Sequence, residues 1–280
     1  RLRPRTERDA KSAGNLRLRV GATSEHSGVS APRVAASFFA TFFARSKKVD
    51  STNQIQLNDL ERHDAAAIGI FGGSFNPIHL GHIALAKEMR RQLHLDEVWL
   101  MVTPLNPFKA KATNLLPDSQ RLALAREALR NEPHIHARDD EFRMLKPSYT
   151  WQTLQTLTKE HPDKQFTLII GADNWLAFDR WRNYQDILSH YPVAIYPRQG
   201  YPVDPAMLPT PGDSGYPRVT LVDTRLYPVS STQIRERVAR RQSLLGLVPR
   251  HIIRKVRALY RAANRRGDSS AANSQPAGKA

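Results

Sequence analysis

Short apolar runs alternate with amphipathic stretches from residue 65 onward. Runs of branched apolar residues indicate buried strands, whereas apolar positions three or four residues apart indicate helices. The pattern predicts strands at 66–71, 98–102, 134–137, 166–170, 192–196 and 219–222, with helices between them and two more after residue 230. Parallel strands need crossover connections, which are usually helical. We therefore expect an α/β fold, a Rossmann-like doubly wound parallel sheet with C-terminal helices, which binds ligands beyond the carboxyl ends of its strands.

The starts of three predicted helices carry side chains that favour N-caps. Asp118 stands before the apolar positions of one helix, and Ser148 or Thr150 stands before the next. Ser230 and Gln233 have the S-x-x-Q spacing of a capping box. We therefore expect side-chain caps at all three helix starts.

The chain of 280 residues divides into one domain and two flanks. We assign 65–262 to the domain, since domains typically hold about 100–200 residues. Residues 1–64 lack the alternating pattern, so we expect a disordered N-terminal extension; an organelle-targeting segment is the alternative, which its seven acidic residues disfavour. The small, polar tail at 263–280 is expected to be disordered. The apolar stretch 34–44 is too short for a membrane span of about 20 residues, so we expect no membrane partner.

The formal net charge of +16 lies mostly in the flanks. Residues 235–266 hold eleven Lys and Arg against one acidic residue, whereas residues 65–234 hold eighteen against seventeen. A nearly neutral centre argues against a domain-wide nucleic-acid surface. The chain has no cysteine, which excludes disulfides, thiolate metal sites and cysteine nucleophiles and fits the reducing cytoplasm, where we expect the protein.

A glycine-rich turn follows the first predicted strand directly. Its sequence is Gly72-Gly73-Ser74-Phe75-Asn76-Pro77-Ile78-His79-Leu80-Gly81-His82. It matches neither the dinucleotide fingerprint nor the P-loop. The paired glycines let a phosphate approach the backbone closely, and the helix that begins near Gly81 points unpaired N–H groups at the same place. The turn therefore predicts an anion site.

Two histidines, His79 and His82, stand three positions apart across this helix start. Imidazole donates hydrogen bonds to phosphate oxygens and, when protonated, supplies positive charge where phosphoryl transfer accumulates negative charge. The alternative is that one histidine caps the helix while the other packs; the H-x-G-H spacing behind two glycines favours the anion-binding role. A metal site is disfavoured because no third His or Cys lies nearby. Asn76 either orients a ligand or caps the turn, and the residues alone leave both open.

A second segment with candidate phosphate ligands lies far downstream, at 229–235. Ser230, Ser231 and Thr232 place three hydroxyls beside a helix start. Arg235 lies in the first turn, where it opposes the helix dipole by roughly a few tenths of a kcal/mol. A bound triphosphate would reverse the sign of that interaction.

Together these segments resemble the nucleotidylyltransferase superfamily, whose members show G-G-[ST]-F-[DN]-P-x-H-x-G-H and a late [IV]-S-[SA]-T-x-I-R. More narrowly, the chain is similar to the bacterial nicotinate-nucleotide adenylyltransferases. Three further stretches support this: P-S-Y-T at 147–150, I-I-G-A-D-N at 169–174, and Phe178 through Trp181 with Ile187. The similarity covers roughly residues 68–260 in order and spacing.

This resemblance implies that the 5′-phosphate of nicotinate mononucleotide attacks the α-phosphorus of ATP, releasing pyrophosphate and giving deamido-NAD, with Mg²⁺ bridging phosphate oxygens. The residues that it places on ATP are Gly72, Gly73, Ser74, Phe75, His79, His82, Ser230, Ser231, Thr232 and Arg235. Those that it places on the mononucleotide are Asn76, Lys109, Thr150, Trp151, Asp173, Trp181 and Arg198. His79, His82, Lys109 and Arg235 are implied to be the catalytic residues.

Individual contacts with the mononucleotide are implied by the same resemblance. Asp173 accepts from a ribose hydroxyl, Trp181 stacks on the pyridine ring, and backbone N–H groups near Thr150 and Trp151 receive the ring carboxylate. Ordinary packing is the alternative for Trp181, as for most tryptophans. The chain departs from many relatives at Phe108, where they carry histidine or arginine, so no charge is expected from that position.

Two other functions remain open from the residues. One is a related nucleotidylyltransferase with another phosphate acceptor, first of all nicotinamide mononucleotide, which differs from the nicotinate form only by a carboxamide. The other is a non-enzymatic module that binds RNA through the basic helices at 235–266, with steep salt dependence. The G-A-D-N and P-S-Y-T stretches favour the pyridine substrate, so we expect no nucleic-acid partner. The oligomeric state stays open, a homo-oligomer included.

Overall fold

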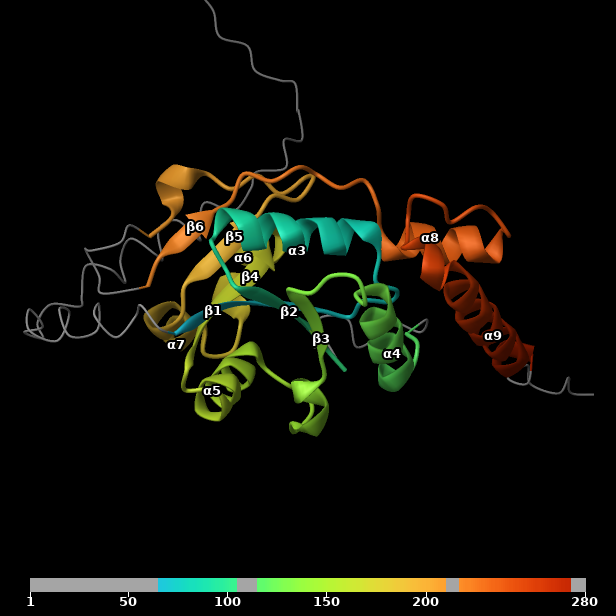
Figure 1. Cartoon of the computed structure of the whole chain (residues 1–280), viewed down its shortest axis with the longest axis horizontal. Helices are drawn as coiled ribbons and strands as arrows, with labels where there is room; N and C mark the ends of the chain where they lie inside the picture. The colour runs from blue at the N-terminus through green and yellow to red at the C-terminus, as the bar shows by residue number, and fades with distance from the viewer. Residues whose placement is uncertain (1–64, 105–114, 210–216, 273–280) are drawn as a thin grey trace, which may run out of the picture. The chain divides into compact units, whose positions relative to one another are not determined.

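A six-stranded parallel sheet forms the centre of the computed structural model, which describes residues 65–104, 115–209 and 217–272 (Figure 1). Its order is β3-β2-β1-β4-β5-β6. The strands are β1 Ala66–Gly73, β2 Glu97–Val102, β3 Ile135–Arg138, β4 Lys164–Gly171, β5 Val193–Tyr196 and β6 Val219–Leu221. Each neighbouring pair is parallel, for example Ile70 opposite Trp99 on β2 and Leu168 on β4. All six predicted strands are present, so the expected doubly wound sheet is confirmed.

Helices cover both faces of the sheet, and Figure 1 shows α3 and α5 on opposite sides. The helices that contribute to one apolar cluster are α3 Leu80–Gln92, α4 Asp118–Ala128, α8 Ser231–Ala239 and α9 Ile253–Ala272. Those of the second cluster are α5 Thr150–Glu160, α6 Ala172–Trp175 and α7 Tyr184–His190. Side chains along β1 alternate between the two clusters, with Phe71 in the first and Ile70 in the second. This alternation is what a strand buried on both faces requires.

The strand order reverses between β1 and β4. The chain runs outward from β1 through β2 to β3, returns through α5 to β4, and then runs outward to β6. The connections that leave β1 and β4 therefore diverge, and a crevice forms where the carboxyl ends of these two strands lie side by side. Gly72 and Gly73 form the end of β1 rather than a turn after it, and the rest of the glycine-rich segment follows at this edge.

Two of the expected N-caps are wrong. The N-cap of α4 is Pro117 rather than Asp118, whose carboxylate instead pairs with Arg121 at 2.6 Å. The N-cap of α5 is Tyr149, which has no side-chain cap bond, while Ser148 donates to Glu141. In both cases another side chain takes the predicted cap: Arg121, one turn along the same helix, for Asp118, and Glu141 from the 3-10 helix η2 Asp140–Arg143 for Ser148. Ser230 does cap α8, since its hydroxyl accepts from the N–H of Gln233 at 3.1 Å.

The expected domain end at residue 262 falls inside α9, which continues to Ala272. The boundary prediction treated the small residues here as a break, but alanine and arginine favour helix strongly enough to continue it. The N-terminal extension, 1–64, lies outside the described residues. Across the described segments, no helix is long and apolar enough to cross a membrane.

Candidate active site

The glycine-rich turn and the two predicted histidines lie at the carboxyl end of β1. His79 is the N-cap of α3: its Nδ1 accepts from the N–H of His82, and Nδ1 of His82 accepts from the N–H of His79, both at 3.3 Å. The rings stack with centroids 3.6 Å apart. Because both Nδ1 atoms accept, each neutral imidazole carries its proton on Nε2. Both histidines thus take part in the helix cap, rather than one capping and the other packing, and their stacked rings keep the two Nε2–H donors close together.

Gly81 keeps this pair compact. A Cβ at Gly81 would lie 3.1 Å from the His79 ring and 3.3 Å from Cβ of Tyr227. Few real Cβ atoms have neighbours this close, so any larger residue would have to push the imidazole aside. The glycine of H-x-G-H therefore provides the space for His79.

The pKa of His79 is lowered to about 4, mainly by burial and to a smaller extent by the positive charge of Arg198. The residue is only 5% exposed. At neutral pH the free protein therefore holds His79 uncharged, as a hydrogen-bond donor. The protonated imidazole considered from the sequence would require the field of a bound anion.

The low pKa of His79 makes a testable contribution to stability. Between pH 6.5 and about 4 the unfolded chain takes up a proton that the folded chain excludes. The contribution of His79 to the free energy of unfolding is therefore fully present above pH 6.5 and is lost as the pH falls towards 4. We expect wild type to lose about 2 kcal/mol more unfolding free energy than His79→Gln between pH 7 and pH 5. Urea titrations at both pH values measure this, and equal losses in the two proteins would contradict it.

The start of α8 lies against the glycine-rich turn. The Ser231 hydroxyl donates to the Pro77 carbonyl and Nη1 of Arg235 donates to the Asn76 carbonyl, both at 2.8 Å. Arg235 also donates to Thr232 at 3.0 Å. The two segments predicted to bind one triphosphate are thus brought together, although they are far apart in the chain. The guanidinium lies beside the turn that precedes the histidine pair.

Buried polar groups that the sequence analysis missed hold this turn in place. Oδ1 of Asn76 accepts from the Tyr260 hydroxyl at 2.6 Å and from the Leu116 N–H at 3.2 Å. Arg121, fully buried, donates to the carbonyls of Ser74 at 2.5 Å and Thr103 at 3.1 Å. Asn76 thus has a clear structural role, and its contact with the mononucleotide stays a prediction. Arginine on an amphipathic helix gives no sequence signal of burial.

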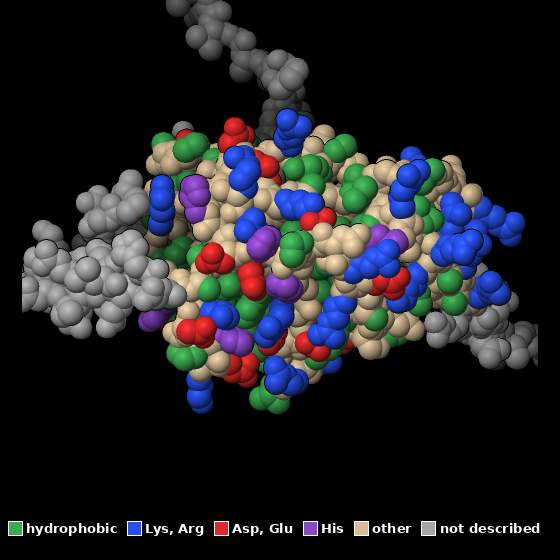
Figure 2. Space-filling model, in the orientation of Figure 1, with side chains coloured by type: hydrophobic (Ala, Val, Ile, Leu, Met, Phe, Trp, Pro, Cys, Tyr) green, Lys and Arg blue, Asp and Glu red, His purple; other side chains and the backbone are tan. Residues whose placement is uncertain are grey.

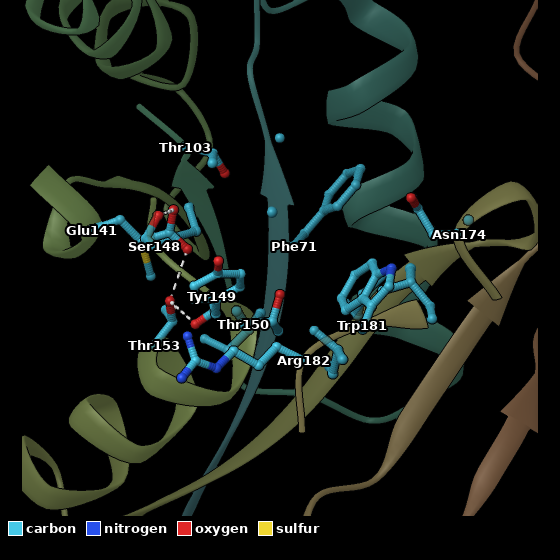
Figure 3. Close-up of a pocket in the computed structure, with 18 of the residues that line it drawn as sticks. Phe71, Thr103, Glu141, Ser148, Tyr149, Thr150, Thr153, Asn174, Trp181 and Arg182 are labelled. Atoms are coloured by element: carbon cyan, nitrogen blue, oxygen red, sulfur yellow. Dashed lines mark hydrogen bonds between the residues drawn. The ribbon is translucent and has the colours of Figure 1, made fainter. Parts of the chain in front are cut away.

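A cavity of about 340 Å³ opens beside the turn, at the carboxyl ends of β1, β2 and β4 (Figure 3). Trp181, Phe71 and Tyr196 contribute aromatic rings to its lining. Gly72 and Gly73 line it from β1, and Thr150 from the start of α5. The first N–H groups of α5 have no partner within the helix, which makes this wall attractive to an anion. The cavity has the size and composition of a small-molecule site.

Several lining residues were not predicted. They include Thr103, Glu141, Ser148, Tyr149, Asn174, Arg180, Arg182 and Tyr196. Ser148, Tyr149 and Asn174 belong to the P-S-Y-T and G-A-D-N stretches that carried the resemblance, so a signal was present for them. Glu141 lies outside these stretches, and nothing in its local pattern distinguishes it from a surface residue.

The other predicted mononucleotide ligands are placed differently. Asp173 and Arg198 form an ion pair, with Nε 3.2 Å from Oδ1. The ring of Trp151 packs 5.4 Å from that of His190, so its side chain belongs to the second apolar cluster. Lys109 and Phe108 lie outside the described residues. Their predicted roles stay predictions.

The fold and the geometry of the site are typical of nucleotide-binding α/β proteins: a cradle of hydrogen-bond donors, formed by His79, His82, Arg235 and the start of α8, lies beside a cavity with aromatic walls. A family model described as cytidylyltransferase-like matches residues 70–237. A probable nicotinate-nucleotide adenylyltransferase from Bacteroides fragilis is 47% identical over 171 residues, which cover 61% of this chain and 81% of that protein. One from Cytophaga hutchinsonii is 39% identical, covering 66% and 92%. The chain therefore belongs to the nicotinate-nucleotide adenylyltransferases, within the cytidylyltransferase-like family.

A solved structure supports the fold. The nicotinic acid mononucleotide adenylyltransferase of Plasmodium falciparum, complexed with NaAD, superposes with a TM-score of 0.57 at 18% identity, covering 71% of this chain and 98% of that one. At this identity the likeness concerns the fold alone. The family and fold class expected from the sequence are both confirmed.

Proposed function

We propose that this protein transfers the adenylyl group of ATP to nicotinate mononucleotide, giving deamido-NAD and pyrophosphate in NAD biosynthesis. One observation carries the proposal: an aromatic cavity closed by a helix start lies directly beside the histidine and arginine cradle. Ring centroids of Phe71, on the cavity wall, and His82, in the cradle, are 6.3 Å apart. A pyridine nucleotide in the cavity would thus place its phosphate next to a triphosphate in the cradle.

The cavity would hold the acceptor through its ring. The face of Trp181 stacks on the pyridine, and the free N–H groups at the start of α5, near Thr150 and Trp151, receive the ring carboxylate. Asp173 accepts from a ribose hydroxyl, and Arg198, already paired with it, adds positive charge towards the phosphate. Lys109 supplies further charge. These contacts fix the 5′-phosphate, so that positioning lowers the barrier.

The cradle would hold ATP through its phosphates. The backbone of Gly72 and Gly73 permits close approach, while Nε2–H groups of His79 and His82 donate to phosphate oxygens. Arg235 and the hydroxyls at the start of α8 bind from the other side. An acceptor oxygen forms a bond to the α-phosphorus as the bond from that phosphorus to the bridging oxygen of pyrophosphate breaks. The donors stabilise the negative charge that develops on the way.

Magnesium would enter as part of the substrate, Mg·ATP. No group of three or more His, Asp or Glu residues able to hold a metal ion occurs in the described part of the chain. The cradle residues are cationic or neutral donors, which suit phosphate oxygens better than a cation. Mg²⁺ then belongs with the phosphates of ATP, as is usual for this ion.

The compartment and partners follow from this reaction. We place the enzyme in the cytoplasm, in keeping with the absence of cysteine. Its partners are ATP and nicotinate mononucleotide. Lys and Arg side chains also gather over α8 and α9 (Figure 2), but we assign Ser231, Thr232 and Arg235 of α8 to the phosphates of ATP rather than to a nucleic acid.

Pyrophosphate release tests the proposal. With Mg·ATP present, nicotinate mononucleotide and nicotinamide mononucleotide are offered in parallel at pH 7. We expect at least about tenfold higher kcat/KM for the nicotinate form, since one charge-assisted contact distinguishes the two rings. Equal kcat/KM values for the two acceptors would instead indicate an enzyme that uses both. No release with either would redirect the search to other phosphate acceptors.

A further inference from the structure

A carboxylate in the cavity wall, that of Glu141, has no part in the reaction described above. Glu141 lies in a short 3-10 helix, η2 Asp140–Arg143, and is only 7% exposed. It accepts from the Ser148 hydroxyl at 3.1 Å and from the Thr153 hydroxyl at 2.9 Å. Figure 3 shows Glu141 at one side of the cavity and Trp181 at the other. Its partners flank the start of α5, where the ring carboxylate is proposed to bind.

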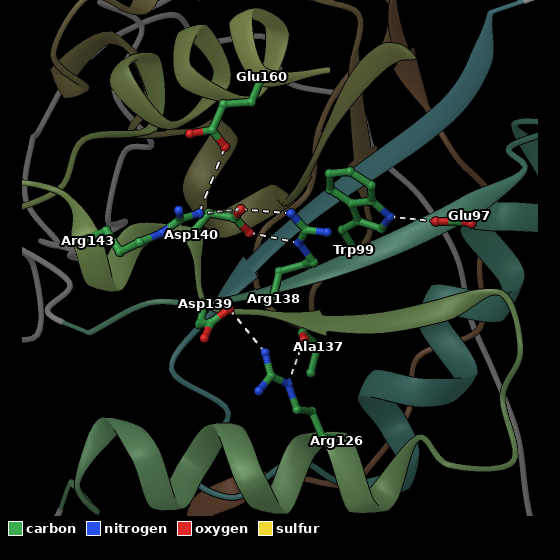
Figure 4. A network of polar contacts seen from close by, with 9 residues as sticks. All are labelled: Glu97, Trp99, Arg126, Ala137, Arg138, Asp139, Asp140, Arg143 and Glu160. Carbon is green, nitrogen blue, oxygen red and sulfur yellow. Dashed lines mark hydrogen bonds and ion pairs between the residues drawn. The ribbon is translucent and has the colours of Figure 1, made fainter. Parts of the chain in front are cut away.

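The arginines near Glu141 are paired elsewhere (Figure 4). Arg138 forms a bidentate pair with Asp140 at 2.8 and 2.9 Å, and its guanidinium lies 4.2 Å from the centroid of the Trp99 ring. Arg143 contacts Asp140 at 3.4 Å and Glu160 at 3.9 Å. Within the described segments, Glu141 has no Lys or Arg at ion-pair distance. The network fixes η2 on β3, and among the described residues the side-chain partners of Glu141 are hydroxyls.

Burial raises the pKa of Glu141, and the hydroxyls of Thr153, Ser148 and Thr103 only partly oppose this effect. The neighbouring charge of Asp140 raises the pKa further. Asp140 itself stays ionised, because Arg138 holds its pKa below the usual range in spite of burial. A second anion in the cavity would act on Glu141 in the same direction as Asp140.

We propose that Glu141 is a specificity residue that carries a proton when the ring carboxylate of nicotinate mononucleotide is bound. This inference rests on the proposed function. Protonated Glu141 adds no negative charge to the cavity and can donate a hydrogen bond. Ionised Glu141 repels the ring carboxylate and can accept from the carboxamide of nicotinamide mononucleotide instead. The preference between the two acceptors therefore depends on pH.

Other charged groups lie near Glu141 or line the same cavity, so the measurement must separate them from Glu141. Asp140 and Arg143 lie on η2, Arg138 on β3 and Glu160 on α5, while Arg180 and Arg182 line the cavity from the segment around η3 Phe178–Arg180. The ratio of kcat/KM for the two acceptors cancels the titration of ATP, of the acceptor phosphate and of the cradle. Only groups that distinguish carboxylate from carboxamide remain in this ratio.

The experiment measures pyrophosphate release with both acceptors from pH 5.5 to pH 8.5, in full-length wild type and Glu141→Gln. In wild type we expect the nicotinate to nicotinamide ratio to fall at least about fivefold as pH rises, and by at most tenfold per pH unit, since one proton is linked. In Glu141→Gln, which is neutral throughout, the ratio should not change with pH. The matched control Glu160→Gln, at the exposed end of α5 and outside the cavity lining, should behave as wild type.

Each outcome decides the inference. A pH-independent ratio in wild type overturns it, as does an equal fall in Glu141→Gln, because a merely structural glutamate would leave the profile unchanged. If Glu141→Gln fails to fold, Ser148→Ala removes one donor to the carboxylate and should move the midpoint to higher pH; an unmoved midpoint overturns the inference. No release with either acceptor in wild type overturns the proposed function as well, whereas release with a constant ratio overturns this inference alone.

Discussion

Replacing His82 by alanine is expected to lower kcat at least about tenfold, the loss seen when a donor to a developing charge is removed. His82 stacks on His79, and the Nδ1 atoms of both rings accept the cap bonds, so the proton of each neutral ring is on Nε2. The loss should appear in kcat rather than in KM for the acceptor, since the imidazole serves the transition state. Steady-state pyrophosphate release with saturating Mg·ATP measures it.

His82 also accepts a hydrogen bond in the helix cap, so a second variant is needed to separate its effect on stability from its effect on turnover. Alanine removes the acceptor for the His79 N–H as well as the donor, and loss of a cap costs about 0.5–2 kcal/mol. His82→Gln separates these effects, because glutamine at this position of a capping box accepts the same N–H. Both variants should lose turnover, but only alanine should lose stability. His134→Ala, at an exposed site before β3, is the control. Full turnover in His82→Gln would assign the residue to the cap alone.

The fold was largely predictable because strands buried on both faces carry continuous apolar runs. The segment 166–170 illustrates this: it lies in β4, with Phe166, Leu168 and Ile170 packed in one apolar cluster and Ile169 in the other. The helix starts were less predictable, because a capping side chain has competitors elsewhere. Ser148 and Asp118 both favour caps by type, yet Glu141 and Arg121 take them.

The candidate site likewise has one part that could be predicted from the sequence and one part that could not. The two segments predicted to bind phosphate could be placed on one edge of the sheet, because the carboxyl ends of parallel strands meet there. The cavity wall could not be derived in the same way: Glu141 and Arg121 look like solvated charges in the sequence. Their burial depends on contacts across 47 residues for Arg121 with Ser74, and across 12 for Glu141 with Thr153. No local pattern encodes such a partner.

Arg121 is expected to give the largest effect on stability. Its guanidinium donates to the carbonyls of Leu116, Ser74 and Thr103 and to the carboxylate of Asp118. Arg121→Met keeps much of the side-chain volume but leaves these buried acceptors without a donor. Breaking a buried, hydrogen-bonded charge network on one side costs about 3–5 kcal/mol. We expect a loss of that size in the free energy of unfolding, measured by urea denaturation.

The comparison with Arg126 shows why burial decides the outcome. Arg126 lies on the same helix and pairs with Asp139 at 3.1 Å, but its side chain is 55% exposed. Water replaces its hydrogen bonds when it is removed, so Arg126→Met should cost less than about 1 kcal/mol. At temperatures where the variant is still folded, Arg121→Met should also lower turnover, because Ser74 loses the hydrogen bond that holds the glycine-rich turn in place. Equal stability of the two variants would mean that water reaches the Arg121 partners, and that α4 rather than this side chain positions the turn.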